Sequence, residues 1–256
     1  AGNALALELA AAWVEHFSLA EMAALLETDI LDFLRSSQPD MPARHRSLRR
    51  VIETSWQLLS TPVQQVLAQL SLFRGRFPRE AALAVPDGGP DLLVKLVNCS
   101  LLQQRGPGRY ELHEMVRQFA AEQLARWTDQ GQQSAERHAS YYLALVGRVA
   151  RTAELIAPVT EELANIRQAW SWAVENRDVA GLAAASVGLW NFYLRKGFFQ
   201  EAAEAFAQAI AATLATPPDT TGRRRALAAL RVAQAVFLNI RSNYAEAIAV
   251  AAEAVS

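Results

Sequence analysis

Residues 101–119, LLQQRGPGRYELHEMVRQF, decide the fold that we expect for this chain. Two short segments, 101–104 and 109–112, flank Arg105-Gly106-Pro107-Gly108; Gly and Pro favour turns, so the sequence predicts a β-hairpin. From His113 onward, hydrophobic residues recur at helical spacing, which predicts a helix that begins where the second strand ends. No other stretch gives a clear strand pattern, so the rest of the chain is expected to be helical.

Composition sets the limits of the interpretation. The 256 residues suffice for about two domains, and 52% hydrophobic with 20% charged residues indicates a globular chain. The formal net charge of −1 gives no global attraction to nucleic acid or to an anionic membrane. A single cysteine, Cys99, excludes an internal disulfide framework and favours a reducing, cytoplasmic location. No apolar run reaches about 18 residues, so no membrane span is predicted.

The first half of the chain reads as a series of short helices around the hairpin. Residues 1–42 are expected to form the C-terminal part of a helical domain plus a linker at 36–42, SSQPDMP. Further helices are predicted at 47–59, 62–71, 78–84 and 90–98, three of them opened by a proline that suits a first helical turn. Together with the hairpin and the helix that follows it, they outline a winged-helix domain over residues 43–128.

The second half is predicted to be helical throughout. After a polar connector at 128–133, we expect helices at 134–151, 160–176, 179–196, 199–214, 222–241 and from 244 onward. The segments KGFFQEA at 196–202 and RSNYAEA at 241–247 repeat one pattern 45 residues apart: a small residue, an aromatic two positions later, then a Glu-Ala pair. Repeated helix pairs at such a period stack into a solenoid.

This pattern resembles tetratricopeptide-type repeats. The residues that carry the resemblance are Gly197, Phe199, Ala202, Phe206 and Ala209, with a weaker match at Tyr244, Ala247 and Ala254. The period of 45 exceeds the usual 34, so these are elongated relatives of the consensus repeat. The expected fold class is therefore mainly α: a winged-helix domain with one small β-hairpin, followed over residues 134–256 by a tetratricopeptide-like solenoid that is incomplete at its C-terminus.

The first half resembles the part of STAND-class signalling NTPases that follows the nucleotide-binding domain, as in bacterial MalT-type and large LuxR-type regulators and AP-ATPases. The matching runs are GNALALELAAAWV, RHRSLRRVIETSWQLLS, LAQLSLFRGRF and RYELHEMVRQFAAEQL. The resemblance implies a fragment that lacks the nucleotide-binding domain and acts as a regulatory and sensor arm. The missing domain would be one partner, an inducer or protein ligand on the solenoid another, and activation would lead to self-assembly.

The same resemblance implies two contacts to ADP. His113, in Leu112-His113-Glu114, matches a Met-His-Asp-like motif whose histidine reaches the β-phosphate. Ala4 stands where the family has the proline of a Gly-x-Pro turn. The residues alone support a plainer alternative for His113, namely a helix cap or a domain contact. Bound ADP or ATP with Mg²⁺ is expected only together with the missing domain.

No enzyme motif is complete in this sequence. It contains no G-x-x-x-x-G-K-[ST], so we expect no ATP hydrolysis by these residues alone. His113-Glu114 opens like H-E-x-x-H, but Arg117 occupies the position of the second histidine. Cys99 lies in an apolar run and is expected in the core. Solvated helix faces are expected for Glu161, Glu162, Glu201 and Glu204.

Two other function classes stay open. A winged helix can place a helix in the DNA major groove, but segment 90–98 has one Lys against one Asp, so DNA binding is not the favoured interpretation. Arg105 and Arg109 could contact phosphate, and the densest basic cluster is at 44–50. A free-standing repeat scaffold is the third class. In the sensor-arm interpretation the candidate partner-binding residues of the solenoid are Trp190, Tyr193 and Arg195, with Trp170, Trp172, Phe192 and residues 222–225 as further candidates. Aromatics at helical spacing more often belong to the core, and residues 222–225 could equally be an exposed helix start.

Overall fold

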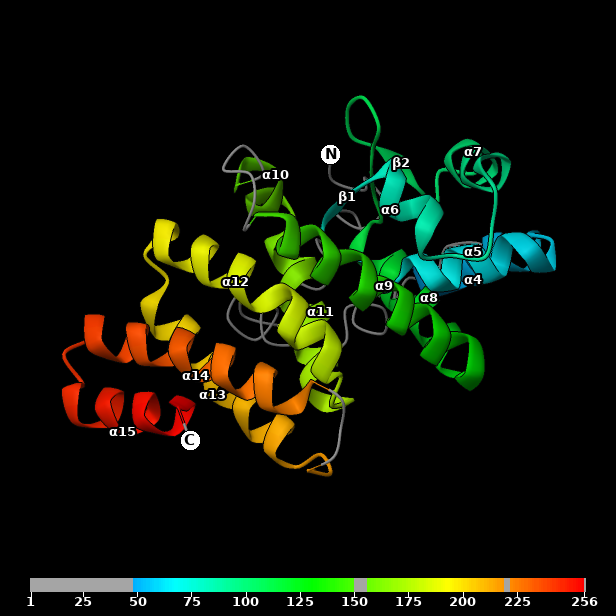
Figure 1. The fold of residues 1–256 in the computed structure, drawn as a ribbon. Coiled ribbons are helices and arrows are strands. Elements are labelled where there is room, and N and C mark those ends of the chain that lie inside the picture. Colours follow the sequence, from blue (N-terminus) through cyan, green and yellow to red (C-terminus); the bar gives the residue numbers. More distant parts are fainter. Residues whose placement is uncertain (1–47, 150–155, 219–221, 256) are drawn as a thin grey trace, which may run out of the picture. The chain divides into compact units, whose positions relative to one another are not determined.

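The computed structural model describes residues 48–149, 156–218 and 222–255 (Figure 1). The helices and linker expected before residue 47 lie outside the described residues. The chain divides into two compact units, Ala1–Ser134 and Ala135–Ser256. Both are mainly helical, and the described strands all belong to the first.

The first unit combines short helices with a small antiparallel sheet. Its elements in chain order are α4 (Leu48–Gln57), α5 (Thr61–Leu70), β1 (Arg76–Pro78), α6 (Arg79–Ala84), α7 (Pro90–Asn98), β2 (Gln103–Gln104), β3 (Arg109–Glu111) and α8 (Glu114–Ala125). The sheet has the order β1-β3-β2, so the hairpin strand β3 lies in the middle. Tyr110 on β3 is paired with Phe77 of β1 and with Gln104 of β2.

The core of this unit follows from the spacing of its apolar residues. Val63, Val66, Leu67 and Leu70 are buried on one face of α5, which packs against α7 and α8. At the sheet, the rings of Phe73 and Phe77 stack with centroids 4.2 Å apart. The predicted hairpin, the helix after it and the helix at 90–98 are confirmed at these places.

Two details differ from the sequence prediction. The third strand, β1, was not predicted, because only its central residue, Phe77, is buried and three residues are too few for a period-two pattern. The polar connector expected at 128–133 is wrong, because helix α9 (Thr128–Val149) already begins there. The Gly131 N–H donates to the Trp127 carbonyl oxygen at 2.8 Å, so helical bonding runs through the glycine.

The second unit contains most of α9 and a succession of paired helices. These are α10 (Ile156–Glu161), α11 (Leu163–Glu175), α12 (Val179–Lys196), α13 (Phe199–Leu214), α14 (Arg223–Ile240) and α15 (Tyr244–Val255) (Figure 1, green to red). Helix α14 packs against α12, α13 and α15, and α12 also packs against α11. The single helix expected at 160–176 is divided into α10 and α11.

The sequence echo appears as a repeated helix ending. Gly197 and Ser242, 45 residues apart, both have left-handed backbones, with φ of 74° and 62°. In each case the next amide closes the last turn: Phe198 N–H donates to Tyr193 O at 3.2 Å, and Asn243 N–H to Leu238 O at 2.9 Å. The helix pairs α12/α13 and α14/α15 are therefore built by the same turn.

Candidate functional site

His113 forms the start of α8. Its backbone is extended (φ −62°, ψ 138°), and its Nδ1 accepts a hydrogen bond from the Met115 N–H at 3.4 Å. The structure therefore places His113 as the N-cap of α8, a role that a neutral imidazole nitrogen can fill. The half-buried ring lies at the positive end of the helix dipole, where an anion would be stabilised.

Charged groups surround this N-terminus. Burial lowers the pKa of His113, while the carboxylates of Glu114 and Glu111 oppose that shift. Hydrogen bonds from Arg117, at 2.8 and 2.5 Å, lower the pKa of Glu114. Burial and the nearby Arg117 also lower the pKa of Arg74. The site thus contains two guanidinium groups, of Arg74 and Arg117, and two carboxylates, of Glu111 and Glu114, around the start of α8.

The hairpin and α7 carry the residues considered for DNA. Arg105 donates to Glu111 at 3.0 Å, which leaves its charge partly neutralised. Arg109 donates to the Arg76 carbonyl at 3.5 Å, and the Arg76 side chain is 61% exposed. Arg79, at the start of α6, is also exposed.

Helix α7 has a mixed outer face. Its exposed residues include Val94, Lys95 and Asn98, whereas Leu93 and Leu96 are buried. Lys95 and Asn98 are residue types that can reach a phosphate and a base edge, but Val94, next to Lys95 in the chain, is 55% exposed and apolar.

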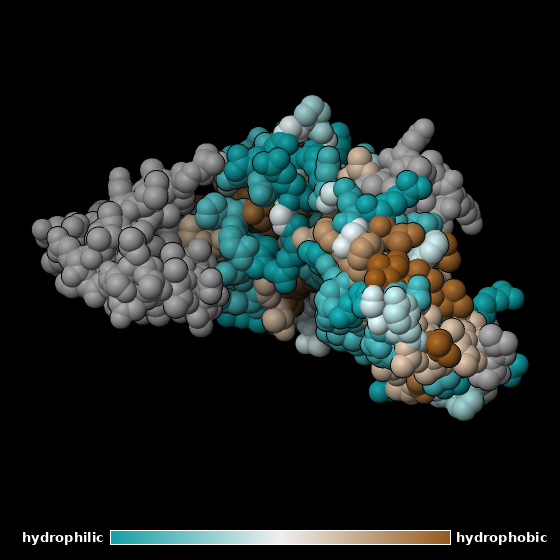
Figure 2. All heavy atoms as spheres, turned by 90° about the vertical axis from the view of Figure 1, so that its left-hand side faces the viewer, coloured by the Kyte–Doolittle hydropathy of each residue, from teal (hydrophilic) through white to brown (hydrophobic). Residues whose placement is uncertain are grey.

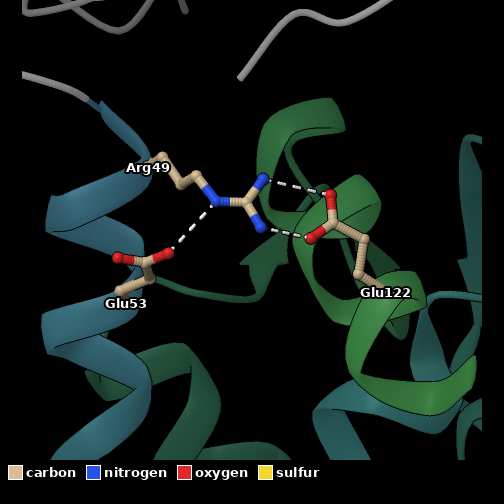
Figure 3. Close-up of polar contacts among 3 residues, drawn as sticks. All are labelled: Arg49, Glu53 and Glu122. Carbon is tan, nitrogen blue, oxygen red and sulfur yellow. Dashed lines mark hydrogen bonds and ion pairs between the residues drawn. The ribbon is translucent and has the colours of Figure 1, made fainter. Parts of the chain in front are cut away.

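Arg49, from the predicted basic cluster, is engaged within the first unit. It lies on α4, donates to Glu53 at 3.1 Å, and forms a two-pronged pair with Glu122 of α8 (Figure 3). Its guanidinium carbon also lies 5.9 Å from the centroid of the Phe119 ring. This arginine joins α4 to α8 and is not presented to a ligand as a free cation. Residues 44–46 of the cluster, and Ala4, lie outside the described residues.

The second-unit candidates separate into core and surface. Tyr193 is 3% exposed, and Trp170 and Phe192 are likewise buried, so these aromatics belong to the core. Arg195 is exposed, and Trp190 is partly exposed. Of the three partner-binding residues selected from the sequence, Tyr193 therefore presents no surface to a partner.

Tyr193 belongs to a polar network that links three helices. Its hydroxyl donates to Glu201 of α13 at 2.8 Å, and Arg167 of α11 donates to the same carboxylate at 2.6 and 2.5 Å. Burial alone would raise the pKa of Glu201, but the bonds from Arg167 and Tyr193 outweigh it and the pKa is lowered. Burial, aided by the Glu201 carboxylate, raises the pKa of Tyr193.

An open groove lies between α12 and α14. Its volume is about 470 Å³. It is lined by Ser186, Val187, Trp190, Arg225, Ala228, Ala229, Val232 and Ala233. The Trp190 Nε1–H is buried and has no acceptor in the part of the chain that the structure describes. Among the residues selected from the sequence, Trp190 and Arg225 meet here; the sequence did not indicate that they would.

Two expectations, for Cys99 and Glu162, are wrong. Cys99, expected in the core, is exposed because it ends α7 as its C-cap. Glu162, expected on a solvated face, is 3% exposed and accepts hydrogen bonds from Tyr142 Oη (2.8 Å) and Asn165 Nδ2 (3.2 Å). Glu201, expected on a solvated face, has a side chain that is 35% exposed and also takes part in the three-helix network.

Metal and membrane features are absent from the described residues. No group of three or more His, Cys, Asp and Glu side chains there could hold a metal ion. No described helix combines the length and the apolar character needed to cross a membrane.

Comparison with known proteins finds similarity to mycobacterial regulators. The chain is 32% identical, over 217 residues, to "Putative HTH-type transcriptional regulator Rv0890c" of Mycobacterium tuberculosis (strain ATCC 25618 / H37Rv). It is equally similar to the corresponding protein Mb0914c of Mycobacterium bovis. The alignment covers 77% of this chain but 24% of each relative, so the chain spans about a quarter of their length. No protein-family model and no solved structure matches.

Proposed function

We propose that this chain is a segment of a transcription regulator, with a winged helix as its first unit and a repeat solenoid that binds a signal as its second. The observation that carries the proposal is the similarity to proteins named HTH-type transcriptional regulators. The order helix, strand, helix, helix, strand, strand in residues 61–111, with the last strand central in the sheet, supports a winged helix. In this proposal the segment binds rather than catalyses and works in the cytoplasm.

The winged helix is proposed to contact DNA through β1, the start of α6, the hairpin and α7. Residues 48–127 carry ten basic and seven acidic side chains, a formal charge of +3, against −1 for the whole chain. The exposed Arg76 and Arg79 with Arg109 would contact phosphates, while Lys95 and Asn98 face outward from α7. The similarity to named regulators moves this interpretation ahead of the regulatory arm that the sequence alone favoured.

Duplex binding by the 256-residue chain tests this function. We expect fluorescence anisotropy to show binding to a labelled duplex that weakens as salt rises, because phosphate contacts release counterions. Arg79→Ala and Arg109→Ala should each weaken binding to all sequences similarly and reduce the salt slope by about one. Arg195→Ala, an exposed arginine of the second unit, is the matched control. Binding that does not depend on salt concentration, or that weakens equally in Arg195→Ala, would count against DNA contact by the first unit.

A second candidate is favoured by the position of His113. Its half-buried imidazole lies at a helix N-terminus, a setting that suits a phosphate. In a STAND-type protein it would hold ADP against a nucleotide-binding domain outside this chain. A signal on the solenoid would then favour an open form that exchanges ADP for ATP with Mg²⁺ and self-assembles.

Two substitutions separate a nucleotide contact from simple capping. Asn is a good N-cap residue, so His113→Asn keeps the cap but removes the imidazole. In the full-length protein, both His113→Asn and His113→Ala should release bound ADP faster if the ring contacts the phosphate. Faster release of ADP from His113→Ala alone would show that the residue acts as a helix cap. Retention of ADP in both variants would refute the contact between the ring and the phosphate.

A further inference from the structure

The groove between α12 and α14 is apolar, and two residues that line it, Trp190 and Arg225, carry polar groups that have no partner among the described residues. Val187 and Val232 are 50% and 56% exposed, and alanines form much of the remaining lining. The Trp190 N–H is buried without an acceptor among the residues that the structure describes, and a buried unpaired donor costs stability unless something accepts from it. Arg225 lines the same groove and forms no ion pair with any other residue that the structure describes. Exposed hydrophobic side chains also gather on this unit, as the brown area at the right of Figure 2 shows.

We propose that this groove binds a small amphipathic carboxylate. Its hydrocarbon part would cover Val187 and Val232, its carboxylate would pair with Arg225, and a shift of the Trp190 ring on binding would let the buried N–H donate to one carboxylate oxygen. A volume of about 470 Å³ suits a small molecule. Charge complementarity favours an anion, because the lining includes Arg225 and no acidic side chain. The inference rests on the proposed role of the second unit as the signal-binding part of a regulator.

Neighbouring arginines show why Arg225 is the relevant cation. Arg223 donates to the carbonyl oxygens of Thr213 and Leu214 at 3.1 and 3.2 Å, so it closes the end of α13 instead of facing a ligand. Arg224 is exposed but does not line the groove. It therefore supplies a matched control on the same helix, with the same charge.

Decanoate serves as the probe in a titration of the 256-residue chain. With ¹⁵N-labelled tryptophan, each indole N–H gives its own resonance, and Trp190→Phe identifies that of Trp190. Decanoate should shift the Trp190 resonance downfield as the N–H gains an acceptor. Decanol, which has the same chain without the negative charge, should bind at least about tenfold more weakly, as a lost charge-assisted hydrogen bond predicts.

The variants test each contact separately. Arg225→Gln should remove the preference for decanoate over decanol, whereas Arg224→Gln should keep it. Trp190→Phe keeps an aromatic ring without the N–H and should weaken decanoate binding by about fivefold, the size of one net hydrogen bond.

Several results would overturn the proposal. Equal affinity for decanoate and decanol would show that the carboxylate is not recognised. A shift confined to the other indole resonances would show that the probe does not bind in this groove. A Trp190 shift that follows protein concentration without added probe would show that a second copy occupies the groove. Capture of a peptide there with no decanoate binding would also refute it. Because DNA binding is assigned to the first unit, failure of the probe with intact DNA binding would leave the proposed regulator standing.

Discussion

At the scale of single residues, His113 connects helix capping to pH. Its Nδ1 can accept from Met115 N–H only when the imidazole is neutral, and burial lowers its pKa below the ordinary value of 6.5. Below pH 6.5 the His113 imidazole therefore binds a proton in the unfolded chain while it is still neutral in the folded chain. The stabilisation of the folded chain that comes from this pKa difference is fully present above pH 6.5. It is lost as the pH falls through the lowered pKa of His113 in the folded chain.

We therefore expect the free energy of unfolding to fall as the pH is lowered from about 7.5 to 5, measured by urea denaturation of the 256-residue chain. His113→Asn keeps a capping side chain without a titrating group, so it should be less sensitive to pH over this range. The titratable groups that the two proteins share contribute alike to both and cancel in the comparison. Identical pH profiles for the two would show that His113 does not titrate with folding.

Helix-ending residues offer a second residue-scale prediction. Ser242 and Arg177 have left-handed backbones (φ 62° and 54°), a conformation that Gly adopts without strain. Ser242→Gly and Arg177→Gly should each stabilise the chain by about 0.5–1 kcal/mol, and Gly197→Ala should destabilise it by about 1 kcal/mol. Thermal unfolding of each variant would show whether its stability rises or falls. Ser171→Gly, in the interior of α11, is the control and should destabilise; a uniform loss in all the glycine variants would contradict the argument.

At the scale of elements, α9 and α12 cross at glycines. A Cβ added at Gly188 would lie 1.9 Å from the Val146 carbonyl oxygen, and one at Gly147 would lie 2.9 Å from that of Ala184. Neither oxygen can move without displacing its helix. Gly188→Ala should therefore destabilise the second unit by about 1–3 kcal/mol or more, despite the better helix propensity of Ala.

The control for this crossing lies in the same helix as Gly147. At Gly131 the nearest atom to an added Cβ is the Leu124 carbonyl oxygen at 3.4 Å, an ordinary contact. Gly131→Ala should gain about 0.5–1 kcal/mol from propensity alone. Chemical denaturation of both variants decides the matter: stabilisation by Gly188→Ala would mean that the helices do not approach so closely.

The sequence predicted those elements whose boundaries are set locally. Pro90 suits a first helical turn, and α7 spans Pro90–Asn98 as expected. Gly106 and Gly108 supply the positive φ values of the hairpin turn, which made the hairpin recognisable. The repeat was visible for the same reason, because the left-handed ending at Gly197 is followed by a fixed order of side chains.

The sequence predictions that failed concern features that depend on packing between residues distant in the sequence. Polarity suggested solvent for Glu162, but Tyr142, twenty residues earlier, and Asn165 satisfy its carboxylate in the core. Trp190 and Arg225 were both named as candidates, yet only the packing of α12 against α14 brings them to one groove. Hydrophobic periodicity identifies a buried face and does not identify the element that covers it.

At the scale of the whole molecule, burial is uneven along the second unit. Helices α12 and α13 bury large side chains, including Phe192 and Phe206, each with no exposed surface. Among the described residues of α15, by contrast, Ala247 alone is buried, while Tyr244 and Ile248 are 59% and 71% exposed. Among the described helices, α15 packs mainly against α14. In a stack held by nearest-neighbour contacts, local stability should follow this gradient.

Hydrogen exchange of the 256-residue chain should therefore show the weakest protection in α15, stronger protection in α14, and the strongest in α12 and α13. Ala247→Gly removes the buried methyl group and should speed exchange in α15 while leaving α12 unchanged. Ile248→Ala truncates an exposed side chain and should have little effect on either helix, because little apolar surface returns to water. Uniform protection from α12 to α15, or equal effects of the two substitutions, would mean that the unit opens as one cooperative block rather than helix by helix from α15.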